Sequence, residues 1–379
     1  MAIVRKFVAL LVFIIITVNS FSGTGANTQC MSTDNTPVDW FIVYKLPKIP
    51  KSNNGYIQDG VGFFYMDVNS PKWVLSEVPI NMTGQHALYN TLQQIYANKT
   101  ENYMFALYND HPPNSKEYSH RGHTKGVVTF DTSTGFWLVH STPQFPPLHN
   151  ASYSWPSSAH DYGQSFLCIS MNVDMLDIIG KQLMYTYPKI YESYMSAPLV
   201  GKFPVMADVV QNDKHVSNPP WFLKASLESI GGKKYDSFAK FSDFDEELYS
   251  AWVAPTYSTQ LMTETWQNGR GKLPSNCTAN YRVFNVQNIA FNQTSTVTFK
   301  ETKDHSKWAV STGNTPSKNI ICIGGINREE PQEHRAGGTV CTIDAAVWKE
   351  FSAIVLKYEK CQNETKVPHA QEIKVIQYN

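Results

Sequence analysis

Short apolar runs recur along the chain, and glycine, proline, asparagine and serine residues separate them. Many of these runs alternate apolar and polar positions or are rich in β-branched and aromatic residues, which is typical of strands. We therefore expect strands at Trp40–Leu46, Gly62–Asp67, Tyr103–Asn109, Gly126–Asp131, Gly135–His140 and Ser165–Asn172, and in the second half at Tyr281–Phe284, Thr296–Phe299, Trp308–Ser311 and Ile320–Ile323.

Longer runs with apolar residues every three or four positions predict helices. These are His86–Asn98, Met175–Met195 with an interruption at Pro188, Pro220–Ile230 and Ala345–Tyr358. Strands and helices mixed in both halves indicate a mixed α/β fold. No low-complexity linker divides the chain, and the proline-containing region 198–220 is the best candidate boundary. We expect an N-terminal lobe of residues 26–200 and a C-terminal lobe of residues 201–379.

The first 25 residues differ from the rest. Arg5 and Lys6 precede an apolar run from Phe7 to Val18, and small and polar residues follow. This order is typical of a secretory signal peptide. The run is too short to cross a bilayer of roughly 30 Å, and no later segment is apolar enough to do so. We expect a protein that enters the secretory pathway, without a membrane span, and acts in the lysosome or outside the cell.

The cysteines and the glycosylation sequons agree with this compartment. Six cysteines follow the signal peptide without a CxxC pair, which favours disulfides over a zinc site but leaves their connectivity open. Six N-x-[ST] sequons mark expected surface glycosylation sites, at Asn81, Asn98, Asn150, Asn276, Asn292 and Asn363.

Charge points to an acidic place of action. The 32 basic and 32 acidic side chains of the whole chain balance at pH 7. Loss of Arg5 and Lys6 with the signal peptide leaves a slight acidic excess, which argues against nonspecific polyanion binding at neutral pH. All 11 histidines remain, and imidazoles gain protons below about pH 6.5. Acidification would therefore make the mature protein cationic, which suits a polyanionic substrate.

Two tripeptides of the same form, one in each half, carry the candidate chemistry. They are His123-Thr124-Lys125 and His305-Ser306-Lys307. Side chains at positions i and i+2 of a strand point to the same face, so each motif directs an imidazole and an ammonium to one place. Convergence of both motifs would suit metal-free phosphodiester cleavage. One imidazole attacks phosphorus, the other protonates the leaving oxygen, and the lysines neutralise the phosphate oxygens.

The sequence after each motif is similar. A strand and a hairpin follow, and a second strand leads to a polar residue, His140 in the first half and Asn327 in the second. On this pattern alone His140 can orient a catalytic group, bind phosphate or be structural, and Arg328 is a candidate phosphate contact. Two such halves facing each other across a pseudo-twofold axis would bring both motifs to one cleft.

Other candidate sites find less support. His111 and His120 lie in a polar loop and are predicted to be surface residues. A metal pair of His120 and His123 lacks a third ligand nearby, so we expect neither a metal nor another cofactor. The chain contains neither a G-x-S-x-G nucleophile motif nor a phosphate-binding GK[ST] loop.

At these motifs the chain resembles the deoxyribonuclease II family of acid endonucleases. The similar stretches keep the same order across nearly the whole mature chain. They are Gly122-His-Thr-Lys-Gly-Val127, Gly135-Phe-Trp-Leu-Val-His-Ser141, Tyr162-Gly-Gln-Ser-Phe-Leu-Cys168, Asp304-His-Ser-Lys-Trp308, Gly325-Ile-Asn-Arg328 and Arg335-Ala-Gly-Gly-Thr-Val-Cys341.

The resemblance implies two phospholipase-D-like lobes that form a pseudo-dimer with the active site in the central cleft. It implies metal-independent cleavage of DNA at acid pH to 3′-phosphate and 5′-hydroxyl ends. It also implies the catalytic set His123, Lys125, His305 and Lys307, with His140 and Asn327 as supporting residues. The implied disulfides are Cys30–Cys168, Cys277–Cys361 and Cys322–Cys341.

One departure concerns the aspartate that phospholipase-D motifs place seven residues after histidine. Asp131 is eight residues after His123, and Thr312 stands near the corresponding place in the second motif. The groups that orient the imidazoles are therefore not identified by the sequence.

The expected reaction passes through a phosphohistidine, with His123 favoured as nucleophile and His305 as acid. The expected partner is double-stranded DNA, cleaved largely without regard to sequence, from dead or engulfed cells. The protein is expected to be a monomer or a homodimer. The alternatives are a lumenal phosphodiesterase that acts on phospholipid and a secreted nucleic-acid-binding protein without catalysis.

Overall fold

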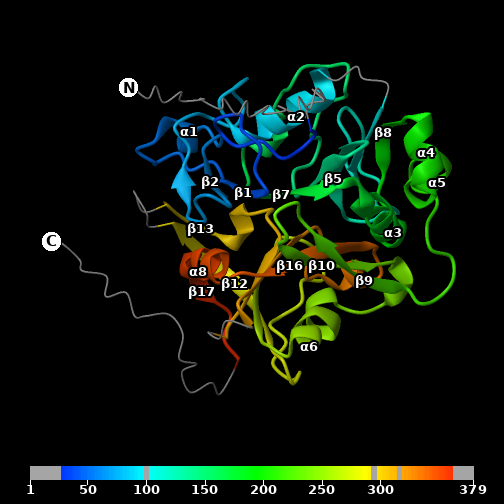
Figure 1. The fold of residues 1–379 in the computed structure, drawn as a ribbon. Coiled ribbons are helices and arrows are strands. Elements are labelled where there is room, and N and C mark those ends of the chain that lie inside the picture. The colour runs from blue at the N-terminus through cyan, green and yellow to red at the C-terminus, as the bar shows by residue number, and fades with distance from the viewer. Residues whose placement is uncertain (1–26, 98–101, 292–296, 314–317, 362–379) are drawn as a thin grey trace, which may run out of the picture.

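The computed structural model describes residues 27–97, 102–291, 297–313 and 318–361, which form two β-sheets packed face to face with helices around them (Figure 1). The mixed α/β, two-lobed architecture is therefore as predicted, while the phospholipase-D-like character of the lobes stays a prediction. No helix in these ranges has the length and apolar character needed to cross a membrane.

The first sheet belongs to the N-terminal half. In the described residues it has eight strands in the order β3-β2-β1-β7-β6-β5-β4-β8, all antiparallel to their neighbours. Its strands are β1 (Trp40–Lys45), β2 (Phe63–Asp67), β3 (Val74–Leu75), β4 (Tyr103–Asn109), β5 (Lys125–Asp131), β6 (Thr134–His140), β7 (Gln164–Asn172) and β8 (Ile190–Met195).

The second sheet belongs to the C-terminal half. Its order is β13-β12-β11-β14-β15-β16-β10-β9, with β17 paired to β12, and β11 and β12 are its parallel pair. Its strands are β9 (Phe222–Glu228), β10 (Lys234–Lys240), β11 (Leu261–Glu264), β12 (Val283–Phe291), β13 (Val297–Lys300), β14 (Trp308–Ser311), β15 (Ile320–Gly324), β16 (Gly337–Ile343) and β17 (Val355–Tyr358).

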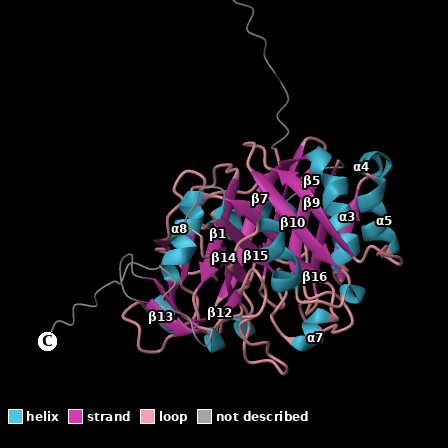
Figure 2. Ribbon diagram, turned by 90° about the horizontal axis from the view of Figure 1, so that it is seen from below, coloured by secondary structure: helices cyan, strands magenta, loops and turns pink. Residues whose placement is uncertain are grey.

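Helices cover the outer faces and both ends of the sheet interface. Helix α2 lies outside the first sheet and α6 outside the second, while α3 and α8 lie at opposite ends between the sheets (Figures 1 and 2). Helix α3 follows a strand of the first sheet but packs on β9 and β10 of the second. The helices are α1 (Gly55–Gln58), α2 (Ala87–Ala97), α3 (Leu176–Thr186), α4 (Ala197–Lys202), α5 (Pro204–Asn212), α6 (Ala254–Tyr257), α7 (Glu330–Glu333) and α8 (Ala345–Ile354).

One buried apolar cluster joins the two lobes. Ile42 and Leu167 of the first sheet and Ile323 of the second belong to it. The rings of Phe64 and Phe291, one from each lobe, stack with their centroids 4.3 Å apart. Because each sheet buries one face against the other, neither lobe could keep this core out of water alone.

Six strands of the two sheets correspond. The order β2-β1-β7-β6-β5-β4 in the first matches β9-β10-β16-β15-β14-β11 in the second. In β6, His140 lies opposite Lys125, whereas the Gly324 N–H bonds to the Lys307 carbonyl at 3.0 Å. Both His-x-Lys motifs therefore enter strands at equivalent places, but His140 corresponds to Gly324 and not to Asn327.

Two predicted helices are wrong in part or in full. The run predicted at Met175–Met195 is helical as α3 only to Thr186, and its last residues form β8. Pro188 follows the helix end and disfavours helical backbone before it, and the β-branched and aromatic residues of β8 suit an edge strand. The run predicted at Pro220–Ile230 forms β9, an edge strand beside β10.

The other predicted elements are found with shifted ends. The C-terminal part of the helix predicted at Ala345–Tyr358 forms β17, and the strand predicted at Tyr281–Phe284 extends as β12 to Phe291. The expected lobe boundary at residue 200 falls inside α4, and the chain changes sheets between β8 and β9. The signal peptide expected at residues 1–25 lies outside the described residues.

The described structure contains three disulfides, and they are the pairs that the family resemblance implies. They are Cys30–Cys168, Cys277–Cys361 and Cys322–Cys341. Of the sequon asparagines, Asn81 and Asn150 are exposed and Asn276 is half-buried. Asn98, Asn292 and Asn363 lie outside the described residues.

The shared core predicts that the lobes unfold together. Phe291→Ala removes a fully buried ring at the lobe interface, which we expect to cost about 3–5 kcal/mol of unfolding free energy. Denaturant unfolding of the oxidised protein, followed by tryptophan fluorescence and circular dichroism, should show one transition at a lower midpoint. Leu356→Ala, at an exposed position of β17, serves as the control. Two separate transitions would contradict a common core.

Candidate active site

Each His-x-Lys motif is held by the main chain of the other lobe. The His123 N–H donates to the Ala336 carbonyl at 2.8 Å, and the His305 N–H donates to the Gly163 carbonyl at 2.9 Å. Ala336 immediately precedes β16, and Gly163 immediately precedes β7. The two motifs therefore meet across the lobe interface, at the ends of equivalent strands.

The imidazole of His123 is half-buried and has a fixed tautomer. Its Nδ1 lies 2.8 Å from Oε1 of Gln332, which comes from α7 of the other lobe. An amide oxygen only accepts hydrogen bonds, so the proton of the neutral ring lies on Nδ1. The lone pair of Nε2 is then free to attack or to accept a proton.

The imidazole of His305 is held by aromatic rings. It stacks on Tyr162 of the other lobe, with ring centroids 4.5 Å apart and an interplanar angle of 1°. Its centroid lies 3.9 Å from that of Trp266, and these two rings are nearly perpendicular. Its Nε2 is buried and has no hydrogen-bond partner in the described structure. Because buried polar atoms are normally paired, the unpaired Nε2 is a candidate to contact a ligand.

The two lysines are almost fully buried and bind protein oxygens. Lys125 Nζ contacts Asp110 Oδ1 at 2.5 Å, and Arg335 from the other lobe binds Asp110 Oδ2 at 2.8 Å. Lys307 Nζ donates to the carbonyl of His305 at 2.6 Å. Lys125 and Arg335 thus share the carboxylate of Asp110, and the charge of Lys307 lies near it, an arrangement that favours an anionic ligand.

These charges act on one another. Burial first, and then the positive charges of Lys307 and Lys125, lower the pKa of His305 to about 2. Burial and Lys125 likewise hold the pKa of His123 well below its usual range, against the opposing influence of Asp110. Burial and Lys125 lower the pKa of Lys307 to about 7. The structure therefore brings all four residues of the predicted set into one electrostatically coupled group.

His140 lies beside this group and Asn327 near the loop that follows β15. His140 is fully buried next to Lys125, and burial, with a further contribution from Lys125, lowers its pKa to about 3. Its Nδ1 accepts the N–H of Thr142 at 3.2 Å. The amide of Asn327 contacts Glu329 at 3.5 Å, and its buried Oδ1 has no partner in the described structure.

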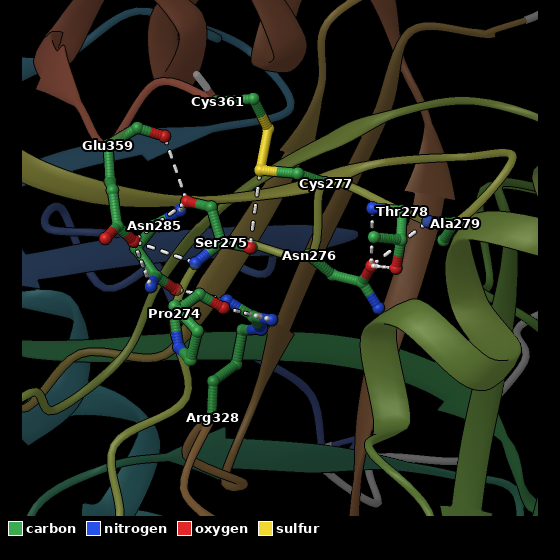
Figure 3. The surroundings of a disulfide bond; sticks show 10 residues. All are labelled: Pro274, Ser275, Asn276, Cys277, Thr278, Ala279, Asn285, Arg328, Glu359 and Cys361. Carbon is green, nitrogen blue, oxygen red and sulfur yellow. Dashed lines mark hydrogen bonds between the residues drawn. A yellow bond between two sulfur atoms is a disulfide. The ribbon is translucent and has the colours of Figure 1, made fainter.

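Arg328 is placed differently from the phosphate contact that we expected. Its guanidinium is buried and hydrogen-bonds Asn285 and, at 3.2 Å, the carbonyl of Pro274 (Figure 3). Its Nε lies 3.5 Å from Glu247. These contacts fix the segment beside the Cys277–Cys361 disulfide, so the donors of Arg328 serve the C-terminal lobe.

Neither Asp131 nor Asp304 contacts a catalytic imidazole through a hydrogen bond in the described structure. Asp131 caps the turn between β5 and β6, where it accepts the N–H groups of Ser133 and Thr134. Asp304, which directly precedes His305, is fully buried and bonded by the Tyr44 hydroxyl and the Ser306 N–H. The orienting groups are thus Gln332 and aromatic rings, which sequence spacing alone could not identify.

Residues that the sequence reasoning did not select complete the site. Asp110, Gln332, Tyr162 and Trp266 contact the predicted set, and Arg335 binds the carboxylate of Asp110. Tyr162 and Arg335 lie in stretches that resemble the deoxyribonuclease II family, and this resemblance could have identified them as site residues. In the described part of the chain, no group of three or more His, Cys, Asp or Glu side chains is arranged to hold a metal ion.

Comparison with known proteins agrees with this geometry. The family model for deoxyribonuclease II matches residues 29–361. The chain is 44% identical to plancitoxin-1 of Acanthaster planci over 89% of its own length and 94% of that protein. It is 40% identical to deoxyribonuclease-2-alpha of Mus musculus over 88% and 93%, and 34% identical to cell death-related nuclease 6 of Caenorhabditis elegans over 93% and 94%. With the match extending over both His-x-Lys motifs and both lobes, the chain belongs to the deoxyribonuclease II family.

Proposed function

We propose that the protein is a metal-independent acid endodeoxyribonuclease that cleaves double-stranded DNA with little regard to sequence. The observation that carries this proposal is the coupling of two imidazoles to two buried lysines where the lobes meet. Its products are 3′-phosphate and 5′-hydroxyl ends. The names of the relatives, among them deoxyribonuclease-2-alpha and cell death-related nuclease 6, support DNA of dead or engulfed cells as the substrate.

His123 is the proposed nucleophile. The Gln332 contact keeps a proton on Nδ1, which directs the lone pair of Nε2 to the substrate. Nε2 attacks phosphorus in line, the P–Nε2 bond forms, and the bond from phosphorus to the 5′-oxygen breaks. The 3′-side of the DNA then remains attached as a phosphohistidine.

His305 is the proposed acid and later base. In the substrate-free site, burial and the neighbouring lysines keep its imidazole neutral. A bound phosphodiester anion offsets the lysine charges and gives the unpaired Nε2 a partner, so it raises the pKa of the ring. His305 then gives its proton to the 5′-oxygen, and afterwards takes a proton from the water that releases the 3′-phosphate.

Lys125 and Lys307 neutralise the nonbridging oxygens during both steps. The ammonium of Lys307 uses one donor on the His305 carbonyl, which leaves donors for phosphate. A hollow beside Arg335 is lined by Tyr187, Phe241 and His120, among others. Aromatic faces beside cations suit a nucleic-acid strand better than a lipid head group, so no second substrate is favoured.

Single substitutions test the two histidines. His123→Ala should abolish plasmid cleavage at pH 5 in excess EDTA, because no other group supplies the nucleophile. His305→Ala should lower kcat about a thousandfold, because the 5′-oxygen loses its acid. Wild-type products should accept label from polynucleotide kinase without phosphatase treatment, as 5′-hydroxyl ends do. His149→Ala, at a surface imidazole paired with Glu192, is the control.

A substrate with a good leaving group separates the two roles. Thymidine 3′-(4-nitrophenyl phosphate) releases nitrophenolate without an acid, so His305→Ala should still show a burst of nitrophenolate and His123→Ala none. The reverse pattern would exchange the roles. A requirement for Mg²⁺, or cleavage by both alanine variants at the wild-type rate, would overturn the proposal.

The pKa of Lys307 predicts the alkaline limit of activity. Its pKa is lowered to about 7, so its ammonium is present below pH 7 and is lost as the pH rises through that value. The value of kcat/KM should therefore fall toward neutral pH. Arginine keeps its positive charge at higher pH than lysine. In Lys307→Arg the alkaline fall of kcat/KM should therefore occur at higher pH, although the maximal kcat/KM should be lower. Lys349→Arg, at an exposed position of α8, is the control. If the alkaline fall of kcat/KM stays at the same pH in Lys307→Arg, titration of Lys307 is not its cause.

A further inference from the structure

Two further lysines, outside the His-x-Lys motifs, are completely buried. Lys45 ends β1 and Lys240 ends β10, and neither side chain is accessible to solvent. Lys45 lies opposite Gln164, the first residue of β7, and Lys240 lies opposite Gly337, the first residue of β16. The two lysines therefore occupy equivalent positions in the two lobes.

Each ammonium is bound by three main-chain carbonyls of one loop. Lys45 Nζ donates to the carbonyls of Ala159, His160 and Tyr162 at 2.5, 2.7 and 2.7 Å. Lys240 Nζ donates to those of Gln332, Glu333 and Arg335 at 2.9, 2.8 and 2.8 Å. An ammonium has three protons, so each lysine uses all of them on its loop.

The two loops are equivalent residue by residue. In each, the bound carbonyls lie five, four and two positions before the first residue of the strand that follows, β7 or β16. Burying an ammonium group carries a large desolvation cost. In both lobes, hydrogen bonds to three main-chain carbonyls offset this cost at equivalent positions. We read this as a structural device that both lobes share.

The residue after each bound segment reaches a catalytic histidine of the opposite lobe. The carbonyl of Gly163, next to Tyr162, accepts the N–H of His305 at 2.9 Å. The carbonyl of Ala336, next to Arg335, accepts the N–H of His123 at 2.8 Å. A lysine of each lobe is thus connected, through one loop, to the histidine of the other.

Side chains of the same loops complete these contacts. The ring of Tyr162 stacks on the imidazole of His305. The amide of Gln332 fixes the tautomer of His123, and Arg335 binds the carboxylate that pairs with Lys125. Movement of either loop would therefore change the main-chain and the side-chain contacts of one imidazole together.

We propose that Lys45 and Lys240 are positioning residues that act across the lobe interface, Lys45 on His305 and Lys240 on His123. Neither touches the phosphate, and the catalytic consequence rests on the proposed function of the two histidines. The proposal is specific in its crossed pattern, because a lysine that merely stabilises its own lobe would affect both histidines alike or neither.

Methionine variants test whether each lysine acts on the histidine of the other lobe, because methionine has a side chain of similar length without the ammonium group. In protein with ¹³C,¹⁵N-labelled histidine, Lys45→Met should move the His305 ring protons downfield, as loss of the Tyr162 ring current does. Tyr162→Leu supplies the reference shift. Removal of the Lys45 charge alone alters the His305 pKa but not this ring-current shift, so spectra are compared at a pH where the ring is neutral.

The second lobe is tested in the same way. Lys240→Met should change the tautomer signals of ¹⁵Nδ1 and ¹⁵Nε2 in His123, and Gln332→Leu supplies the reference. Each methionine variant should lose about a hundredfold in kcat with KM nearly unchanged, because the imidazole is misplaced while the phosphate-binding lysines remain. Lys233→Met, which removes a half-buried lysine paired with Asp344 between the sheets, is the matched control.

Three outcomes would overturn the proposal: unchanged imidazole signals in folded variants, signals of both histidines changed alike, or activity that falls only with the folded fraction. Should the methionine variants not fold, Lys45→Gln and Lys240→Gln retain two donor protons and should give smaller shifts of the same crossed pattern. The spectra need no turnover, so a wild-type protein that cleaves no DNA would refute the proposed function and leave this test intact.

Discussion

Positive charge buried against protein oxygen atoms is the constraint on which the site depends. In the proposed mechanism the ammonium groups of Lys125 and Lys307 hold the phosphodiester, although burial lowers the pKa of Lys307. The fold meets this demand with Asp110 for one lysine and a main-chain carbonyl for the other. Because these oxygens come from strand ends and loops at the lobe interface, the packing of the sheets decides whether the cations keep their place.

The same charges explain why acid conditions suit the chemistry. Burial and the neighbouring ammonium groups lower the pKa of both imidazoles, so the proposed nucleophile is already neutral at low pH before substrate binds. In the proposed mechanism the bound phosphodiester then supplies the negative charge that raises the pKa of the acid, His305. Substrate binding and protonation of His305 are therefore linked in this mechanism, and the lowered pKa of Lys307 predicts its upper pH limit.

The sequence identified those site residues that lie close to one another along the chain. His123 with Lys125, and His305 with Lys307, lie two residues apart on strand ends, so their convergence follows from strand geometry and pseudo-symmetry. The runs that became β8 and β9 were predicted wrongly because a short apolar run does not distinguish a strand from a helix. The sequence placed His140 and Asn327 at equivalent positions, although His140 corresponds to Gly324 in register. The connection after β14 is longer than the turn after β5, so counting residues from each motif did not give the register.

The remaining site residues depend on contacts between distant segments. Gln332 lies 209 positions from His123, and Tyr162 reaches His305 from the other sheet. Neither pairing leaves a periodic signal in the sequence, because each joins residues of different lobes. The crossed hydrogen bonds from His123 to Ala336 and from His305 to Gly163 have a consequence for biosynthesis. A nascent chain that has completed only its first lobe still lacks the carbonyl that orients its own histidine, so a newly made molecule becomes a nuclease only after its last β-strands have been synthesised.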